Sequence, residues 1–332
     1  MRRVTDRNRI PILDGWRAIS ILLVIGSHLL PLGPSSLELN SLAGAAGMAV
    51  FFCLSSFLIV TFLYQGMPVP EFLRKRIARI VPLAWVAVLV LVLWNGASGE
   101  QIVRNLLFVS NLPPADLLRH GEHLWSLGIE MQFYVVAAAL ALICGPRGMW
   151  AVPFLCFAVT AARIIDQQTI SIVTWHRVDE ILSGGILALL YAHGRHTLLK
   201  RYPLWLAVLV FLACSHPASG FLQYLRPYAA AAMVGTSLVW APVLVQRALE
   251  SAPMSYIAGI SYALYVIHAI LAGSWLGTGT TVEKYLKRPL LIAATFVLAH
   301  LSASYLETPI IRLVKRAREG GLAPQRLDSR SP

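Results

Sequence analysis

Residues 12–28 read ILDGWRAISILLVIGSH, an apolar run that carries the ionisable side chains of Asp14, Arg17 and His28. Arg17 and His28 are eleven residues apart, so at about 100° per residue their side chains lie within about 20° of one helix face. Asp14 lies within about 60° of Arg17 on the same stripe. Because ionisable groups are costly inside lipid, this face must contact protein, water or a ligand. The run predicts a membrane helix with a functional face.

The composition indicates a polytopic membrane protein of the all-α class. Only 13% of the 332 residues are charged and 57% are hydrophobic, and the apolar residues form long runs. Taking runs of about 20 residues as spans, we predict about ten transmembrane helices. They lie near residues 12–32, 42–64, 79–95, 123–145, 149–166, 178–193, 203–216, 227–246, 254–277 and 289–313. An amphipathic stretch from Ile102 to Asn111 is left uncounted.

The distribution of the basic residues predicts the orientation. With ten spans, most of the 28 Lys and Arg residues fall on one side, which places both termini in the cytoplasm. This bias explains most of the net charge of +12, so no nucleic-acid partner is predicted. The first apolar run has polar groups within it and no small-residue cleavage site, and we interpret it as a retained span.

The sequence predicts one domain with a tail, and no metal site. Residues 1–316 are predicted to form one transmembrane domain, and residues 317–332 a disordered cytoplasmic tail rich in Gly, Pro, Ser and charge. The four cysteines show no close spacing and no pairing with His in metal-ligand order, so no metal site is predicted. They are Cys53, Cys144, Cys156 and Cys214.

A basic cluster precedes the third predicted span, in the run EFLRKRIAR from Glu71 to Arg79. Its cations are Arg74, Lys75, Arg76 and Arg79, and the last two share a helical face by their i, i+3 spacing. One interpretation is a topogenic anchor that binds lipid headgroups. The other is a cradle for the phosphates of a cytosolic nucleotide-like cosubstrate, since guanidinium groups bind phosphate bidentately.

The fourth predicted span opens with HLWSLGIEMQFY, residues 123–134. His123, Ser126 and Glu130 lie on nearly the same side of a helix, and Glu130 is expected at a depth similar to that of His28. A carboxylate buried there needs a cationic or hydrogen-bonding partner, and an imidazole is the natural one. The alternative is a polar clamp between two helices.

Further polar side chains are expected in the same outer half of the membrane. His268 lies toward the outer end of a predicted span, and Arg177 and Asp179 begin another. Each alone is more often a packing group or an interfacial ion pair than a catalyst. Glu307 is instead expected near the inner face, where with Arg312 it would stabilise a helix end.

Seven segments, taken in order, resemble those of the membrane acyltransferase family 3, the polysaccharide O-acyltransferases. The resemblance runs from about residue 12 to residue 316. The segments are LDGWRAIS (13–20) with His28, GMAVFFCLSSFLI (47–59), FLRKRIARIVP (72–82), LWSLGIEMQFY (124–134), RVDEILSG (177–184), ISYALYVIH (260–268) and ETP (307–309).

The resemblance implies transfer of an acyl group, most often acetyl from acetyl-CoA, onto a sugar hydroxyl of a surface or secreted glycan or its lipid-linked precursor. Acyl-CoA would be a cosubstrate and no cofactor would be bound permanently. A bacterial inner membrane and glycan synthesis or export machinery are the expected surroundings. The family pattern of a basic residue, ten intervening positions and a His falls on Arg17 and His28, and its R-x-x-R motif on Arg76 and Arg79.

The chain departs from the family pattern at three positions. Ala49 stands where an acidic residue is frequent, Ser56 where Gly is frequent, and Met131 where the fourth-span motif often has a second Glu. Roles that rest on the missing acids do not transfer to this chain.

These residues suggest a division of labour along the first helix. Arg17 and His28 are about 16 Å apart along the helix, comparable to the reach of a pantetheine arm, so they cannot touch one carbonyl together. Arg17 and the basic cluster, Arg74, Lys75, Arg76 and Arg79, would bind the CoA phosphates. His28 would be the general base, oriented by Glu130. Ser126, Tyr134 and His268 are open candidates for the oxyanion donor.

The remaining predicted positions concern the acceptor. His123, Ser126, Arg177 and Asp179 are predicted to bind it, and Arg17, His28, Glu130 and His268 form the predicted catalytic set. A transporter or flippase for a glycolipid or anion would use similar intramembrane polar groups and stays as the alternative. A membrane scaffold is a third possibility, and it would tolerate loss of His28.

Overall fold

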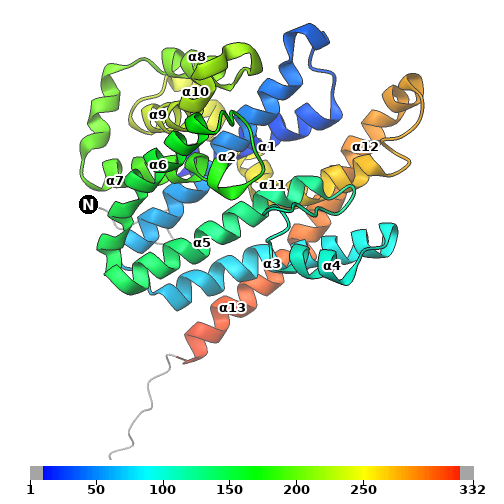
Figure 1. Ribbon diagram of the computed structural model, residues 1–332, viewed down its shortest axis with the longest axis horizontal. Helices are drawn as coiled ribbons and strands as arrows, with labels where there is room; N and C mark the ends of the chain where they lie inside the picture. Colours follow the sequence, from blue (N-terminus) through cyan, green and yellow to red (C-terminus); the bar gives the residue numbers. More distant parts are fainter. Residues whose placement is uncertain (1–9, 322–332) are drawn as a thin grey trace, which may run out of the picture.

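The computed structural model describes residues 10–321, and all regular secondary structure in that range is helical (Figure 1). This confirms the predicted all-α class. Short 3₁₀ turns join several of the helices. The α-helices are α1 (Pro11–Leu29), α2 (Leu39–Tyr64), α3 (Val69–Asn95), α4 (Gly99–Leu106), α5 (Trp125–Cys144), α6 (Ala151–Ile165), α7 (Asp179–Ala192), α8 (Leu204–Ser215), α9 (Arg226–Val239), α10 (Val243–Leu249), α11 (Ala252–Gly273), α12 (Thr281–Ser302) and α13 (Thr308–Gly321).

Helix α2 is the central element of the bundle, because it packs against both α1 and α7 and most of its residues are buried. Glycines allow these close approaches. A Cβ atom on Gly47 would lie 2.7 Å from the carbonyl oxygen of Ser20 in α1. One on Gly184 in α7 would lie only 1.9 Å from the carbonyl oxygen of Cys53. Small residues at such crossings are the usual means of packing helices in membranes.

The described residues contain fewer candidate membrane spans than the ten predicted from the apolar runs. Six helical stretches of the described chain are long and apolar enough to cross a membrane, or eight if each of two bent pairs counts as one span. The expected ten is not confirmed, because α6, α7, α8 and α9 have only 15, 14, 12 and 14 residues. The stretch from Glu122 to Ile165, which joins α5 and α6, passes as a single long candidate. The orientation of the termini stays a prediction.

The amphipathic stretch that was left uncounted begins in the short helix α4. The Ser98 hydroxyl caps this helix by accepting a hydrogen bond from the backbone N–H of Gln101 at 3.1 Å. The helix ends at Leu106, so only the first half of the stretch is helical. Figure 1 shows α4 beside α3, away from α1 and α2.

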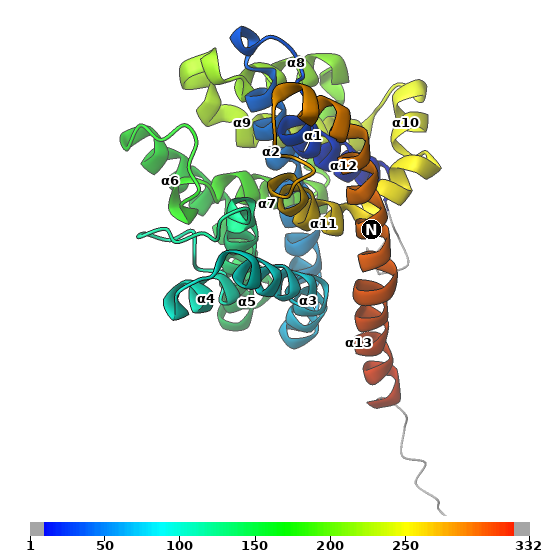
Figure 2. The ribbon, with the colours of Figure 1, turned by 90° about the vertical axis from the view of Figure 1, so that its right-hand side faces the viewer.

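The chain ends in a long helical arm. Helix α12 passes through a π-helical turn, Ala303–Glu307, into α13, and Figure 2 shows the two helices running on in nearly one direction. Helix α13 continues to Gly321, beyond the predicted domain boundary at residue 316. The rest of the predicted tail, residues 322–332, and the basic residues within 1–9 lie outside the described residues.

Candidate active site

Two histidines from distant parts of the chain form the centre of the candidate site. His28 lies near the end of α1 and His268 near the end of α11, and these two helices pack together. Nδ1 of His28 is 2.8 Å from Nε2 of His268, and the two rings stack with their centroids 5.1 Å apart. His268 is fully buried, whereas His28 is exposed. The predicted site residues His28 and His268 are therefore brought together.

The partners of His268 fix where the protons of this pair reside when both rings are neutral. Nδ1 of His268 is 2.7 Å from the backbone oxygen of Tyr265 and 3.1 Å from that of Leu264. A carbonyl oxygen only accepts, so Nδ1 of His268 is the donor and Nε2 holds a lone pair. His28 must then donate from Nδ1 to that lone pair. Nε2 of His28 is left as an acceptor, and it has no hydrogen-bond partner within residues 10–321.

His123 and Ser126, predicted to bind the acceptor, lie buried next to His268. The ring of His123 is 5.3 Å from that of His268, and its Nε2 donates to the backbone oxygen of Val266 at 3.1 Å. Tyr265 donates its hydroxyl proton to the backbone oxygen of His123. Ser126 therefore donates to the Tyr265 hydroxyl, 2.6 Å away. These hydrogen bonds hold α5 against α11 and position His268.

Glu130 does not contact His28, contrary to the prediction. Its Oε1 accepts hydrogen bonds from the Tyr134 hydroxyl at 2.5 Å and from the Ser55 hydroxyl of α2. The bond that Glu130 was expected to make to His28 is made by His268 instead. Glu130 is 4% exposed and bridges α5 and α2, as the alternative of a polar clamp between helices requires.

A second cluster gathers cations from α1 and α3. Arg17 lies 3.4 Å from Asp14 on its own helix, and its charge is within electrostatic reach of Arg79 and Arg76. The guanidinium of Arg76 is 5.9 Å from the ring of Tyr134, which in turn binds Glu130. The three arginines predicted to bind phosphate by the two family motifs are thus brought together.

Glu307 belongs to this second cluster. Its carboxylate accepts a hydrogen bond from the Ser302 hydroxyl at 3.3 Å, and the positive charge of Arg79 lies within electrostatic reach of it. The expected pairing with Arg312 does not occur among the described residues. The difference arises because residues five apart lie about 140° apart around a helix, so Glu307 and Arg312 point in different directions.

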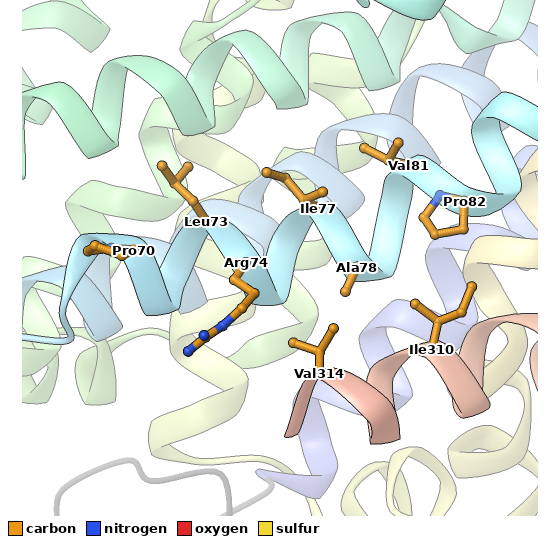
Figure 3. Close-up of a pocket in the computed structure, with 9 residues that line it drawn as sticks. All are labelled: Pro70, Leu73, Arg74, Ile77, Ala78, Val81, Pro82, Ile310 and Val314. Atoms are coloured by element: carbon orange, nitrogen blue, oxygen red, sulfur yellow. The ribbon is translucent and has the colours of Figure 1, made fainter. Parts of the chain in front are cut away.

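The four cations of the basic cluster do not lie together in the structure. Lys75 forms an ion pair with Glu71 at 3.2 Å. Arg74 lines a groove between α3 and α13, as Figure 3 shows. At about 100° per residue, Arg76 and Arg79 lie about 200° and 140° around the helix from Arg74. The structure therefore keeps Arg76 and Arg79 with Arg17 and separates Arg74 from them.

Arg177 and Asp179 lie in a buried ion-pair network that joins α6, α7 and α9. Asp179 is fully buried and lies 2.5 Å from Arg163. Glu180 lies 3.0 Å from Arg177 and 2.7 Å from Arg226. Because Asp179 is enclosed by these partners, it does not offer the open carboxylate that binding of an acceptor requires. Removing one member of such a network leaves an uncompensated buried charge, so its first role is to hold the fold.

Sequence reasoning missed several members of these clusters. Arg163 was visible as a lone cation in an apolar run, which is a signal for a buried partner. Ser55 and Tyr265 gave no such signal, because hydroxyl groups are common in buried membrane helices.

Comparisons with known proteins show the family of the chain. The model of the acyltransferase family 3, described as an acyltransferase domain, matches residues 10–306. The peptidoglycan O-acetyltransferase OatA of Listeria monocytogenes is 24% identical, over 93% of this chain and 57% of its own length. The acyltransferase MdmB of Streptomyces mycarofaciens is 24% identical, over 98% of this chain and 97% of its own.

A further relative is the exopolysaccharide production protein ExoZ of Rhizobium meliloti, 30% identical over 46% of this chain and 52% of its own length. The chain thus spans little more than half of the Listeria and Rhizobium proteins. No solved structure matches the chain. The family model covers both histidines and all three clustered arginines, and the chain belongs to the acyltransferase family 3.

Proposed function

We propose that this protein is an O-acyltransferase that moves an acyl group, most often acetyl, from acyl-CoA to a sugar hydroxyl of a glycan or its lipid-linked precursor. The observation that carries this proposal is the pair of His28 and His268, in which Nε2 of an exposed imidazole is left free to accept a proton. A glycan acceptor is supported by the names of two relatives, a peptidoglycan O-acetyltransferase and an exopolysaccharide production protein. The surroundings we propose are a bacterial inner membrane and the machinery that makes or exports the glycan.

The proposed reaction uses His28 as the general base. Nε2 of His28 takes the proton of the acceptor hydroxyl while its oxygen attacks the thioester carbonyl. The C–S bond of the tetrahedral intermediate then breaks, and the CoA sulfur leaves with the proton returned by the His28 imidazolium. His268 stabilises that imidazolium, because its Nε2 accepts the Nδ1–H of His28 throughout. It has the position that Asp or Glu occupies in other catalytic dyads, without their charge.

The donor is proposed to bind at the other polar cluster. The guanidinium groups of Arg76 and Arg79 lie within electrostatic reach of that of Arg17, and such groups bind phosphate oxygens bidentately. Arg17 and His28 are about 16 Å apart along α1, so the phosphates and the thioester would occupy the two ends of one path. Glu130 accepts hydrogen bonds from Ser55 and Tyr134, and these bonds hold α5 against α2.

The proposal is tested by acyl transfer with purified protein, radiolabelled acetyl-CoA and a pool of glycans or lipid-linked sugars. The His28→Ala variant should have a kcat lower by about 10² to 10⁴, because it lacks the general base. The matched control is His300→Ala, which removes another exposed histidine, on α12 and outside both polar clusters. It should keep the wild-type rate.

Equal transfer by wild type and His28→Ala would disprove the role of the base. If neither protein labels any acceptor while both are folded and the wild type binds no acyl-CoA, the alternative of a transporter or flippase takes precedence. Labelling by wild type alone supports both the reaction class and the base.

A further inference from the structure

A groove of about 500 Å³ runs between α3 and α13. Figure 3 shows Arg74 and Val314 toward one end of it, and Pro82 and Ile310 toward the other. One residue of the lining is charged and the other eight are apolar. The lining residues are Pro70, Leu73, Arg74, Ile77, Ala78, Val81, Pro82, Ile310 and Val314.

The groove is separate from the proposed phosphate cradle. Arg76 faces α5, where its guanidinium lies 5.9 Å from the Tyr134 ring. Arg79 lies within electrostatic reach of Arg17 on α1. Arg74 and Ala78, one helical turn apart, face α13 instead. Helix α3 therefore presents cations to two different environments.

Arg74 has no ion pair or hydrogen bond within the described part of the chain, whereas the neighbouring Lys75 is paired with Glu71. Its side chain is exposed at the end of α3 that carries the basic cluster. A cation at one end of an otherwise apolar groove is complementary to a molecule with one anionic group and a hydrocarbon chain.

The groove opens beside an exposed apolar surface of α3. Ile77, which lines it, is 47% exposed, and the exposed apolar surface of α3 continues through Trp85 and Leu89. From Pro70 to Pro82 the groove follows about 18 Å of helix, at about 1.5 Å per residue. This length and lining fit an acyl chain lying along α3.

We infer that this groove binds an anionic membrane phospholipid, with one acyl chain between α3 and α13 and the phosphate on Arg74. Acyl-CoA is a poor occupant, because a groove with one cation offers little to a molecule with several phosphates. Binding is measured without acyl-CoA or acceptor, so the result does not depend on the proposed acyl transfer.

The test is native mass spectrometry of the purified full chain in detergent, titrated with phosphatidylglycerol and with phosphatidylcholine. Wild type should retain one phosphatidylglycerol about fivefold more tightly than phosphatidylcholine, because the choline cation of phosphatidylcholine offsets the phosphate charge that Arg74 would bind. Arg74→Gln should abolish that preference. Ala78→Phe fills the groove and should weaken retention of both lipids.

Matched controls distinguish this site from general lipid binding. Arg147→Gln removes an exposed arginine predicted to lie on the same side of the membrane, and Val90→Phe enlarges an exposed residue of α3 outside the groove. Both should bind lipid as wild type does.

Equal retention of the two lipids by wild type would overturn the inference, and so would an unchanged Ala78→Phe. An equal loss in Arg147→Gln and Arg74→Gln would show nonspecific attraction, which also overturns it. Competition by glycerol phosphate as effective as that by phosphatidylglycerol would mean a headgroup site without a chain, against the inference. If Ala78→Phe does not fold, Arg74→Gln decides alone, because it changes an exposed side chain.

Discussion

At the scale of single residues, a backbone carbonyl determines which nitrogen of the exposed imidazole of His28 is free to accept a proton. The oxygen of Tyr265 accepts from Nδ1 of His268, and this sets which nitrogen of His268 can accept from His28. Nε2 of His28 is therefore the nitrogen that stays free to accept a proton. No charge is needed for this selection, which suits a site inside a membrane where a buried carboxylate is costly.

His268 is a positioning residue in this scheme, and its substitutions separate that role from simple packing. His268→Phe removes the acceptor for Nδ1–H of His28 and should lower kcat by about 10 to 10², with the KM for acyl-CoA unchanged. His268→Gln keeps a side-chain acceptor and should recover part of the loss. Steady-state kinetics on both variants measure the effect. Equal losses in the two variants, or a change confined to KM, would contradict the role.

At the scale of elements, the position of α2 depends on the small residues where it crosses its neighbours. The backbone of α2 approaches α7 so closely at Gly184 that a Cβ atom has no space beside Cys53. Because α2 also contributes Ser55 to the bond with Glu130, a shift of this helix would alter the middle of the proposed path.

Gly184→Ala should therefore destabilise the protein by about 1 to 3 kcal/mol or more, since α2 and α7 must separate to admit a methyl group. Gly259→Ala is the matched control, because Gly259 is in α11 and a Cβ there meets no atom within 4 Å. That change should be neutral or slightly stabilising, because Ala is the better helix former. Unfolding in detergent measures both. A similar destabilisation by the two variants would contradict the role of the crossing, because Gly259 has no neighbour within 4 Å for the added methyl group to meet.

At the scale of the whole molecule, two polar clusters are held apart by the length of α1. At one end of α1, Arg17 lies within electrostatic reach of Arg76 and Arg79. At the other end, His28 is hydrogen-bonded to His268. Groups more than about 7–10 Å apart with no shared partner usually act independently. The two clusters should therefore affect different kinetic parameters.

We expect Arg79→Ala to raise the KM for acyl-CoA and His28→Ala to lower kcat. The double variant should show the sum of the two changes in activation free energy within about 0.5 kcal/mol. His28→Ala combined with His268→Phe is the matched comparison, and it should deviate from additivity because these residues are in contact. The measurement is kcat/KM for the three single and the two double variants. Strong coupling between Arg79 and His28 would mean that the clusters act on one bound group.

Much of the fold and part of the site followed from the sequence alone. The cost of charge in lipid and the long apolar runs indicated the helical class. The fixed geometry of a helix placed Arg17 and His28 on one face, and Arg76 and Arg79 on another. The number of spans did not follow, because the short helices α6 to α9 and the bends between them depend on packing that apolar runs do not encode.

Tertiary structure decided which groups meet. His28 bonds to His268 and not to Glu130, because the azimuth and depth of α11 against α1 bring together residues 240 positions apart in the chain. The same holds for Arg74, which faces α13, and for Asp179, which is enclosed by Arg163. The sequence by itself determined which residues share a face of one helix, since that depends on local geometry. Only packing between helices determined what each face contacts.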